Sequence, residues 1–227
     1  MSVENWYRDA GATDFWGFEG EGPGTAVGSP TFVDGLGGGL AAATDGDDGF
    51  VVQPRLSRTS QSFSVAFWFL PTSGSPSGDV FRWGSTPGVG VEWNGAGGSR
   101  RPETVTFWVR VSNGSFALRL DSPTTLAPDR WHLLVLTVET INIWGGVQAV
   151  AYVDGERVGA GSYRGGLFNW VNMNRPSTLT VLAGGAAGAV DEMGLLATAL
   201  SGSEVSALMG AGPSDTSVAR YGWGVVF

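Results

Sequence analysis

Two stretches in the second half of the chain constrain its fold most. The first, A-Y-V-D-G-E-R-V at residues 151–158, places Asp154-Gly155 between two runs of β-formers. Both residues tolerate the positive φ that a two-residue type I′ turn requires, so this stretch predicts a β-hairpin. The second, A-V-D-E-M-G-L-L at residues 189–196, is an apolar strand that carries two adjacent acids. Ser201 and Glu204 follow it with capping-box spacing, which predicts a short helix after the strand.

Alternating apolar residues predict further strands. Residues 62–70 and 105–111 place their Phe and Val residues on one face, while residues 131–138 are apolar on both faces and predict a central strand. The chain has 37 Gly and 11 Pro but only 15% charged residues, so turns are frequent. Ten or more short strands without a βαβ rhythm predict an all-β, two-sheet antiparallel sandwich.

Composition excludes several classes of function. Cysteine is absent, which excludes disulfides, thiol catalysis and Cys-ligated zinc. The net charge of −8 disfavours binding to nucleic acid and to anionic membranes. The first ten residues have neither the basic nor the apolar region of a signal peptide, and no apolar run reaches membrane-spanning length. We therefore expect no nucleic-acid partner and no membrane insertion.

Five stretches in fixed order resemble one family. They are D-G-D-D-G-F-V-V-Q-P (45–54), S-F-S-V-A-F-W-F-L-P (62–71), D-R-W-H-L-L-V-L-T-V (129–138), the 151–158 hairpin and the segment at 188–208. Together they resemble the laminin G-like, concanavalin A-like lectin jelly roll. The resemblance implies two curved sheets packed face to face, with one short C-terminal helical turn. It implies an N-terminal arm at 1–13, a jelly-roll domain at 14–212 and a C-terminal strand or extension at 213–227.

The same resemblance says little about activity, because the superfamily includes lectins, adhesion modules, glycosidases, lyases and structural domains. His132, the only histidine, lies in a predicted buried strand, and similar domains carry it as a framework residue. No Glu is followed two residues later by Asp, and the adjacent Asp191 and Glu192 point to opposite faces of a strand. The paired carboxylates of a glycosidase are therefore not predicted, and we expect no enzyme activity.

Several similar jelly rolls hold one structural calcium ion. The resemblance implies three ligand positions here, namely Glu19, Asp47 in the 45–48 turn, and Asp191. Their oxygen atoms suit a hard cation. The alternative, which we favour, is turn chemistry, since Asp and Gly both accept left-handed backbone conformations.

Tryptophan suggests a sugar-binding surface. The chain has ten Trp residues, and several stand next to Gly or Asn in predicted turns, where an exposed ring stacks on sugar C–H groups. The alternative, which the sequence supports equally, is that these rings cap the ends of the sandwich or contact a neighbouring subunit. The glycan-binding or interface candidates are Trp93, Asn94, Arg100, Arg101, Trp144, Asn169, Trp170, Asn172 and Arg175.

Three hypotheses for the function follow. The first is a non-catalytic structural or adhesion module of a bacteriophage virion, as a capsid decoration, tail or fibre component. Such a protein is made in the cytoplasm without an export signal, lies on the virion surface after lysis, and contacts neighbouring subunits as a homo-oligomer or lattice. The second is a lectin-like module for cell-surface polysaccharide. A glycosidase or polysaccharide lyase is the third hypothesis.

Overall fold

The computed structural model describes residues 2–19, 24–46, 48–56, 62–84, 88–96, 100–110, 115–128, 130–141, 146–164 and 178–212. Its elements in chain order are α1 (Val3–Asp9), β1 (Ala12–Trp16), β2 (Thr25–Val27), β3 (Thr31–Asp34), the 3-10 helix η1 (Leu36–Gly38), β4 (Leu40–Thr44), β5 (Gly49–Val52), β6 (Ser62–Pro71), β7 (Gly78–Gly84), β8 (Gly88–Asn94), β9 (Thr104–Arg110), β10 (Phe116–Asp121), β11 (His132–Thr140), β12 (Val147–Val153), β13 (Glu156–Tyr163), β14 (Leu179–Gly184), β15 (Gly188–Leu196) and α2 (Gly202–Ala211).

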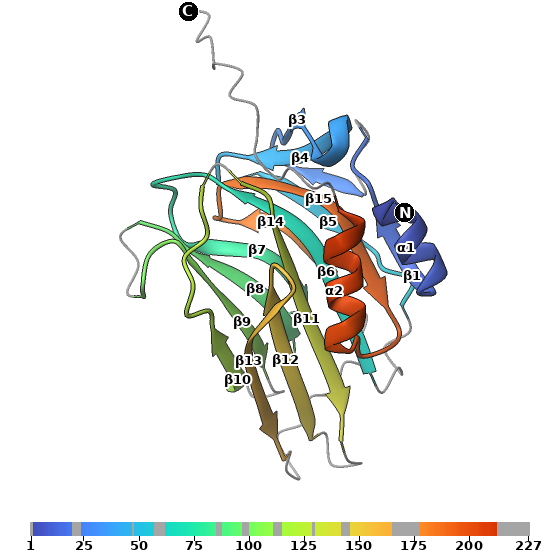
Figure 1. Cartoon of the computed structure of the whole chain (residues 1–227). Coiled ribbons are helices and arrows are strands. Elements are labelled where there is room, and N and C mark those ends of the chain that lie inside the picture. The colour runs from blue at the N-terminus through green and yellow to red at the C-terminus, as the bar shows by residue number, and fades with distance from the viewer. Residues whose placement is uncertain are drawn as a thin grey trace, which may run out of the picture.

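The strands form two antiparallel sheets (Figure 1). Sheet A has the order β13-β12-β11-β6-β15-β4-β3, and β1 also pairs with β15; sheet B has the order β10-β9-β8-β7-β14-β5-β2. The predicted all-β antiparallel sandwich is therefore confirmed. The predicted central strand is confirmed too, since β11 lies between β12 and β6 and is buried over most of its length.

The main hydrophobic core lies between the sheets, where the alternation predicted it. Sheet A contributes the inner face of β6, and sheet B contributes the inner faces of β7, β8 and β9. Aromatic rings meet across the core: Phe63 contacts Trp83, and Phe69 contacts Trp93, both edge to face. These apolar side chains are removed from water, which supplies most of the driving force for folding.

Both α-helices, α1 and α2, cover the outer face of sheet A, where a second hydrophobic cluster forms. The hydroxyl of the fully buried Tyr7 donates to the Ala66 carbonyl at 2.9 Å. Gly194 makes room for that ring, because a Cβ there would lie 2.2 Å from Tyr7 Cε1. Residues 1–13 were predicted to be an arm, but Val3–Asp9 form α1, which packs as part of the domain.

Local turn and cap chemistry follows the predictions. Asp154 and Gly155 have φ of 51° and 81°, so the β12–β13 hairpin has the predicted positive-φ turn. The predicted C-terminal helix is α2. Its N-cap, Ser201, accepts a bond from Glu204 N, and Glu204 Oε2 accepts one from Ser201 N at 2.7 Å, which completes the capping box.

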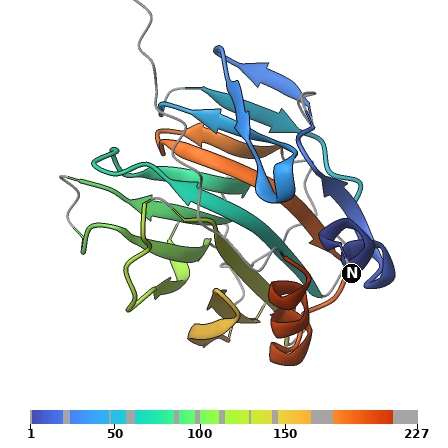
Figure 2. The ribbon, with the colours of Figure 1, turned by 45° about the horizontal axis from the view of Figure 1, so that its top comes forward.

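Sheet B has no described helix on its outer face. Figure 2 shows the two α-helices on one side of the molecule and the green strands of sheet B on the other. None of the described helices is long and apolar enough to cross a membrane. At the edge of the outer face of sheet B, the β10 residues Phe116, Arg119 and Asp121 are exposed to solvent.

Candidate functional site

Strand register arranges the outer face of sheet B into rows that run across β10, β9, β8 and β7. The first row is Phe116, Arg110, Gly88 and Gly84, and the second is Arg119, Trp108, Gly90 and Arg82. The third is Asp121, Thr106, Glu92 and Asp79, and Thr104 lies beside Asn94 in the fourth. We call the first two rows the arginine end, because they contain three arginines and no carboxylate. We call the third the acid row.

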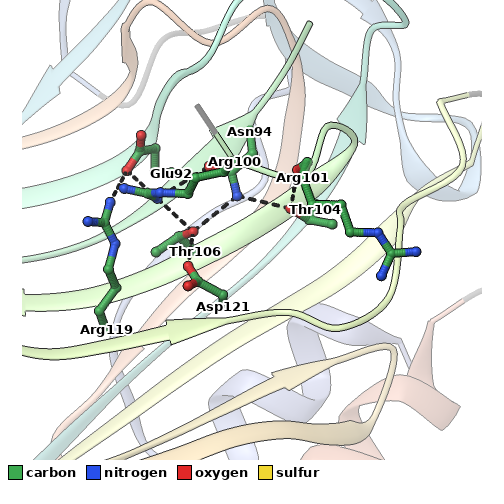
Figure 3. A network of polar contacts seen from close by, with 8 residues as sticks. All are labelled: Glu92, Asn94, Arg100, Arg101, Thr104, Thr106, Arg119 and Asp121. Atoms are coloured by element: carbon green, nitrogen blue, oxygen red, sulfur yellow. Dashed lines mark hydrogen bonds and ion pairs between the residues drawn. The ribbon is translucent and has the colours of Figure 1, made fainter. Parts of the chain in front are cut away.

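Figure 3 shows the polar network that fills the acid row and the fourth row. One guanidinium nitrogen of Arg100 lies 3.0 Å from Glu92 Oε2, 3.3 Å from Asn94 Oδ1 and 2.7 Å from Thr106 Oγ1. The hydroxyl of Thr106 donates to Asp121 at 2.6 Å. This network fixes the polar side chains in one arrangement, which is what recognition of a polar ligand requires.

Asn94 is the buried centre of that network. It is 2% exposed, and its amide donates to Thr104 and Thr106, each at 3.0 Å. Glu92 has two arginine partners, Arg100 at 3.0 Å and the β10 residue Arg119 at 3.4 Å.

Aromatic rings and guanidinium groups stack at the arginine end. The Arg110 guanidinium lies 4.8 Å from the centre of the Trp108 ring and 4.5 Å from the centre of the Phe116 ring. Arg119 lies 4.6 Å from the same Phe116 ring, and such cation–π contacts hold the charged groups in place. Phe116 is 40% exposed, one of the few large apolar side chains of the described residues that face solvent to this extent.

Two acids of the acid row, Asp79 and Glu92, are register partners on neighbouring strands. Burial raises the pKa of Asp79, and the charge of Glu92 raises it further. The charges of Arg82 and Arg110 and a hydrogen bond from Trp108 lower it. The absence of paired carboxylates was predicted from single strands. A pair that comes from two strands has no signature in the sequence.

The predicted glycan candidates divide into three groups. Asn94 and Arg100 belong to the network, and Arg101 is exposed beside it, donating to the Pro123 carbonyl at 2.5 Å. The prediction that Trp93 is an exposed turn residue is wrong: its ring is fully buried between the sheets and its indole N–H donates to Ser75 at 2.8 Å. The remaining candidates lie outside the described residues, namely Trp144, Asn169, Trp170, Asn172 and Arg175.

Trp83, which also stands beside a glycine, is likewise in a strand and buried. Sequence reasoning missed Trp108, Arg110, Phe116 and Arg119. A signal for two of them was present, because the inward Val and Phe residues of the 105–111 alternation leave Trp108 and Arg110 on the opposite face.

His132 occupies a framework position. It is 6% exposed; its Nδ1 lies 2.7 Å from Asp154 Oδ2, and its Nε2 lies 3.1 Å from the Ala127 carbonyl oxygen. Asp154 also accepts a bond from Leu133 N at 2.9 Å. Both ring nitrogens are engaged in tying the start of β11 to its surroundings, which leaves neither facing a serine hydroxyl.

Two of the three predicted calcium ligands, Glu19 and Asp191, bind backbone amides on the outer face of sheet A. Asp191 Oδ2 accepts from Leu36 N at 2.7 Å, and Glu19 Oε2 accepts from Leu40 N at 3.1 Å. Burial raises the pKa of Asp191 to about 8, and the charges of Glu192 and Glu19 act in the same direction.

Glu192 completes this group of acids. Burial and the charges of Glu19 and Glu4 raise its pKa to about 7. Within the described residues, no three His, Asp or Glu side chains converge closely enough to hold a metal ion. Asp47 lies outside those residues, so calcium binding by Glu19, Asp47 and Asp191 stays a prediction, which the effect of EDTA on the melting temperature tests.

The family follows from the sequence and agrees with this architecture. Residues 44–206 match the model of the concanavalin A-like lectin/glucanases superfamily. The chain belongs to this superfamily. The resemblance of the five ordered stretches is thereby confirmed. No curated protein sequence matches the chain significantly.

Solved structures share the superfamily fold at low sequence identity. Domain 4 of AbnA, an extracellular arabinanase from Geobacillus stearothermophilus in complex with arabinotriose, superposes with a TM-score of 0.63 at 19% identity, covering 87% of this chain and 98% of that domain. The binding domain of Paraclostridial Mosquitocidal Protein 1 has a TM-score of 0.57 at 13% identity, covering 82% of this chain and 47% of that one. The binding domain of botulinum neurotoxin DC in complex with SialylT has a TM-score of 0.56 at 12% identity, covering 82% of this chain and 45% of that one.

Proposed function

We propose that this protein is a non-catalytic carbohydrate-binding module and that the outer face of sheet B holds the glycan. The observation that carries the proposal is the composition of that face. Fixed hydrogen-bonding groups in the acid row lie beside the exposed ring of Phe116, on a sheet face with no described helix over it. Sugar binding uses this combination, since aromatic rings take the C–H faces and polar groups take the hydroxyls.

The similar structures support the proposal. One is described in complex with arabinotriose, and two are described as binding domains. The fold therefore accommodates ligand-binding modules, although at these identities it does not specify where the ligand lies.

A glycan array with three proteins tests the proposal. We expect the wild-type protein to bind at least one glycan, and Phe116→Ala to weaken that binding several-fold through loss of ring stacking. Ile141→Ala is the matched control, because Ile141 is similarly exposed at 44% but directly follows β11 of sheet A. Absence of binding to any glycan at high protein density, or equal loss in both variants, would contradict the proposal.

Hydrolysis is a second candidate function, favoured by the cross-strand pair of Asp79 and Glu92. Asp79, whose pKa burial raises, is suited to the general acid, and Glu92 lies opposite it on the neighbouring strand as the second carboxyl group. Release of reducing ends from a bound polysaccharide, abolished by Asp79→Asn, would establish this activity. Unchanged polysaccharide after prolonged incubation would remove it.

The setting of the module is a separate proposal. We propose a bacteriophage virion surface, as a decoration, tail or fibre component, with neighbouring subunits as partners. The sandwich supports this idea as a rigid platform in which Val3–Asp9 are packed into the domain. Light scattering tests the oligomeric state, and antibody labelling of native particles tests the location; a monomer absent from particles would contradict both.

A further inference from the structure

The arginine end differs in charge from the rest of the molecule. The chain has 13 Arg and no Lys against 21 acids, giving a net charge of −8. In the two rows of the arginine end, Arg82, Arg110 and Arg119 face the same side as Trp108 and Phe116, and these rows contain no carboxylate. A local excess of cations in an acidic protein indicates a ligand that carries negative charge.

Arg110 is the cation of this end that forms no close ion pair with a described acid, although its charge helps to lower the pKa of Asp79. Arg82 pairs with Asp79 at 3.3 Å, and Arg119 pairs with Glu92 at 3.4 Å. Arg110 forms no ion pair with a described residue, and its buried Nε–H has no acceptor among them. A buried donor without an acceptor costs free energy in the unliganded protein, and such exceptions often mark a functional position.

The rings around Arg110 orient it. Trp108 and Phe116 contact the guanidinium group, so the N–H groups at its edge remain the route by which it binds a partner. A planar fork of N–H groups matches a carboxylate, which accepts two parallel hydrogen bonds. The exposed Phe116 ring beside it suits the C–H face of a sugar.

We propose that the arginine end selects an acidic glycan, with Arg110 binding the carboxylate of a uronic acid residue and Phe116 stacking on the same or the next sugar ring. This inference rests on the proposed carbohydrate-binding function and specifies its substrate class. The acid row then contacts the hydroxyls of the neighbouring sugars through the network around Arg100. The net charge of −8 opposes non-specific attraction of a polyanion, so binding depends on this local site.

Isothermal titration with four polymers tests the inference. The probes are polygalacturonate, its methyl ester, neutral arabinan and dextran sulfate. We expect the wild-type protein to bind polygalacturonate at least about tenfold more tightly than the methyl ester, because a charge-assisted hydrogen bond is lost in the ester. We expect Arg110→Gln to lose the same factor and Arg110→Lys, which keeps the charge but not the fork, to lose part of it.

Arg8→Gln is the matched control, since Arg8 is exposed on α1, which packs on sheet A. Urea unfolding of each variant shows that the fold is retained, and should Arg110→Gln fail to fold, the comparison of acid with ester in the wild-type protein decides.

Preference for arabinan or the ester, or unchanged polygalacturonate binding in Arg110→Gln, would overturn the inference and leave the proposed function intact. Binding to dextran sulfate that is stronger than binding to polygalacturonate, and that about 0.5 M salt abolishes, would also overturn the inference, because non-specific attraction between charges behaves in this way. Absence of binding to all four polymers and to the glycan array would overturn the proposed function itself.

Discussion

The buried carboxyl group of Asp191 should make the stability of this domain fall as the pH rises. Asp191 is 1% exposed, and burial raises its pKa from the ordinary value of 3.8 to about 8, despite hydrogen bonds from Leu36 N at 2.7 Å and Glu192 N at 2.8 Å. Between pH 3.8 and about pH 8, the folded state therefore holds a proton on Asp191 that the unfolded state has released. The contribution of Asp191 to the free energy of unfolding is fully present below about pH 4 and is lost as the pH rises through 8.

The magnitude follows from proton linkage. One proton bound only by the folded state changes the free energy of unfolding by about 1.4 kcal/mol per pH unit. Over the window from 3.8 to about 8, Asp191 accounts for at most about 6 kcal/mol. Glu192, whose pKa is raised to about 7, acts in the same direction.

Urea denaturation of wild type and Asp191→Asn at pH 5, 6, 7 and 8 measures this effect. Asparagine offers one acceptor to the two backbone donors, so the variant should be less stable by about 1–3 kcal/mol at pH 5. Because the variant lacks the titrating group, the deficit should shrink by about 1 kcal/mol per pH unit and vanish or reverse near pH 8.

Glu204→Gln is the control of opposite sign. Bonds from the Ser201 hydroxyl and N–H lower the pKa of Glu204, so its contribution is present above pH 4.5 and is lost as the pH falls. Stability curves of wild type and Asp191→Asn that run parallel across the whole range would refute the reasoning.

Other substitutions test the packing. Gly194→Val should lower the free energy of unfolding by about 1–3 kcal/mol, because the new side chain overlaps the Tyr7 ring. Gly210→Ala, at an open position of α2, should raise it by about 0.5–1 kcal/mol. Equal urea midpoints for the two variants would contradict the docking of α1. Trp93→Ala should cost about 3–5 kcal/mol in a thermal or urea melt, whereas a loss below about 1 kcal/mol would contradict its burial. Tyr7→Phe should cost about 1–2 kcal/mol through the hydrogen bond to Ala66, and an unchanged midpoint would argue against that bond.

The alternating strands, the hairpin and the capped helix could be predicted from sequence because each depends on neighbours a few residues away. Helix α1 could not, because its seven residues are stabilised by burying Trp6 and Tyr7 against sheet A rather than by local propensity. The stretch L-A-A-A-T at residues 40–44 lacks alternation of apolar and polar residues, yet it forms β4 through pairing with β3 and β15. Here tertiary context overrides weak strand propensity.

The candidate site was predicted only in part for a related reason. Trp93-Asn94-Gly95 has the composition of a turn, but β8 continues through Asn94, and alternation turns Trp93 inward. The neighbours that matter on the outer face, such as Arg110 with Phe116, come from different strands. They meet only through strand register, which a single sequence does not specify.

The positions at which the chain enters and leaves the described domain determine how it can be displayed. Helix α1 begins the domain on sheet A, and Gly212, which ends the described part, packs against Trp68 of the same sheet. A carrier fused directly before α1 would lie on the sheet A side of the sandwich, and the arginine end would face away from it. Copies tethered in this way would direct their guanidinium groups away from the carrier.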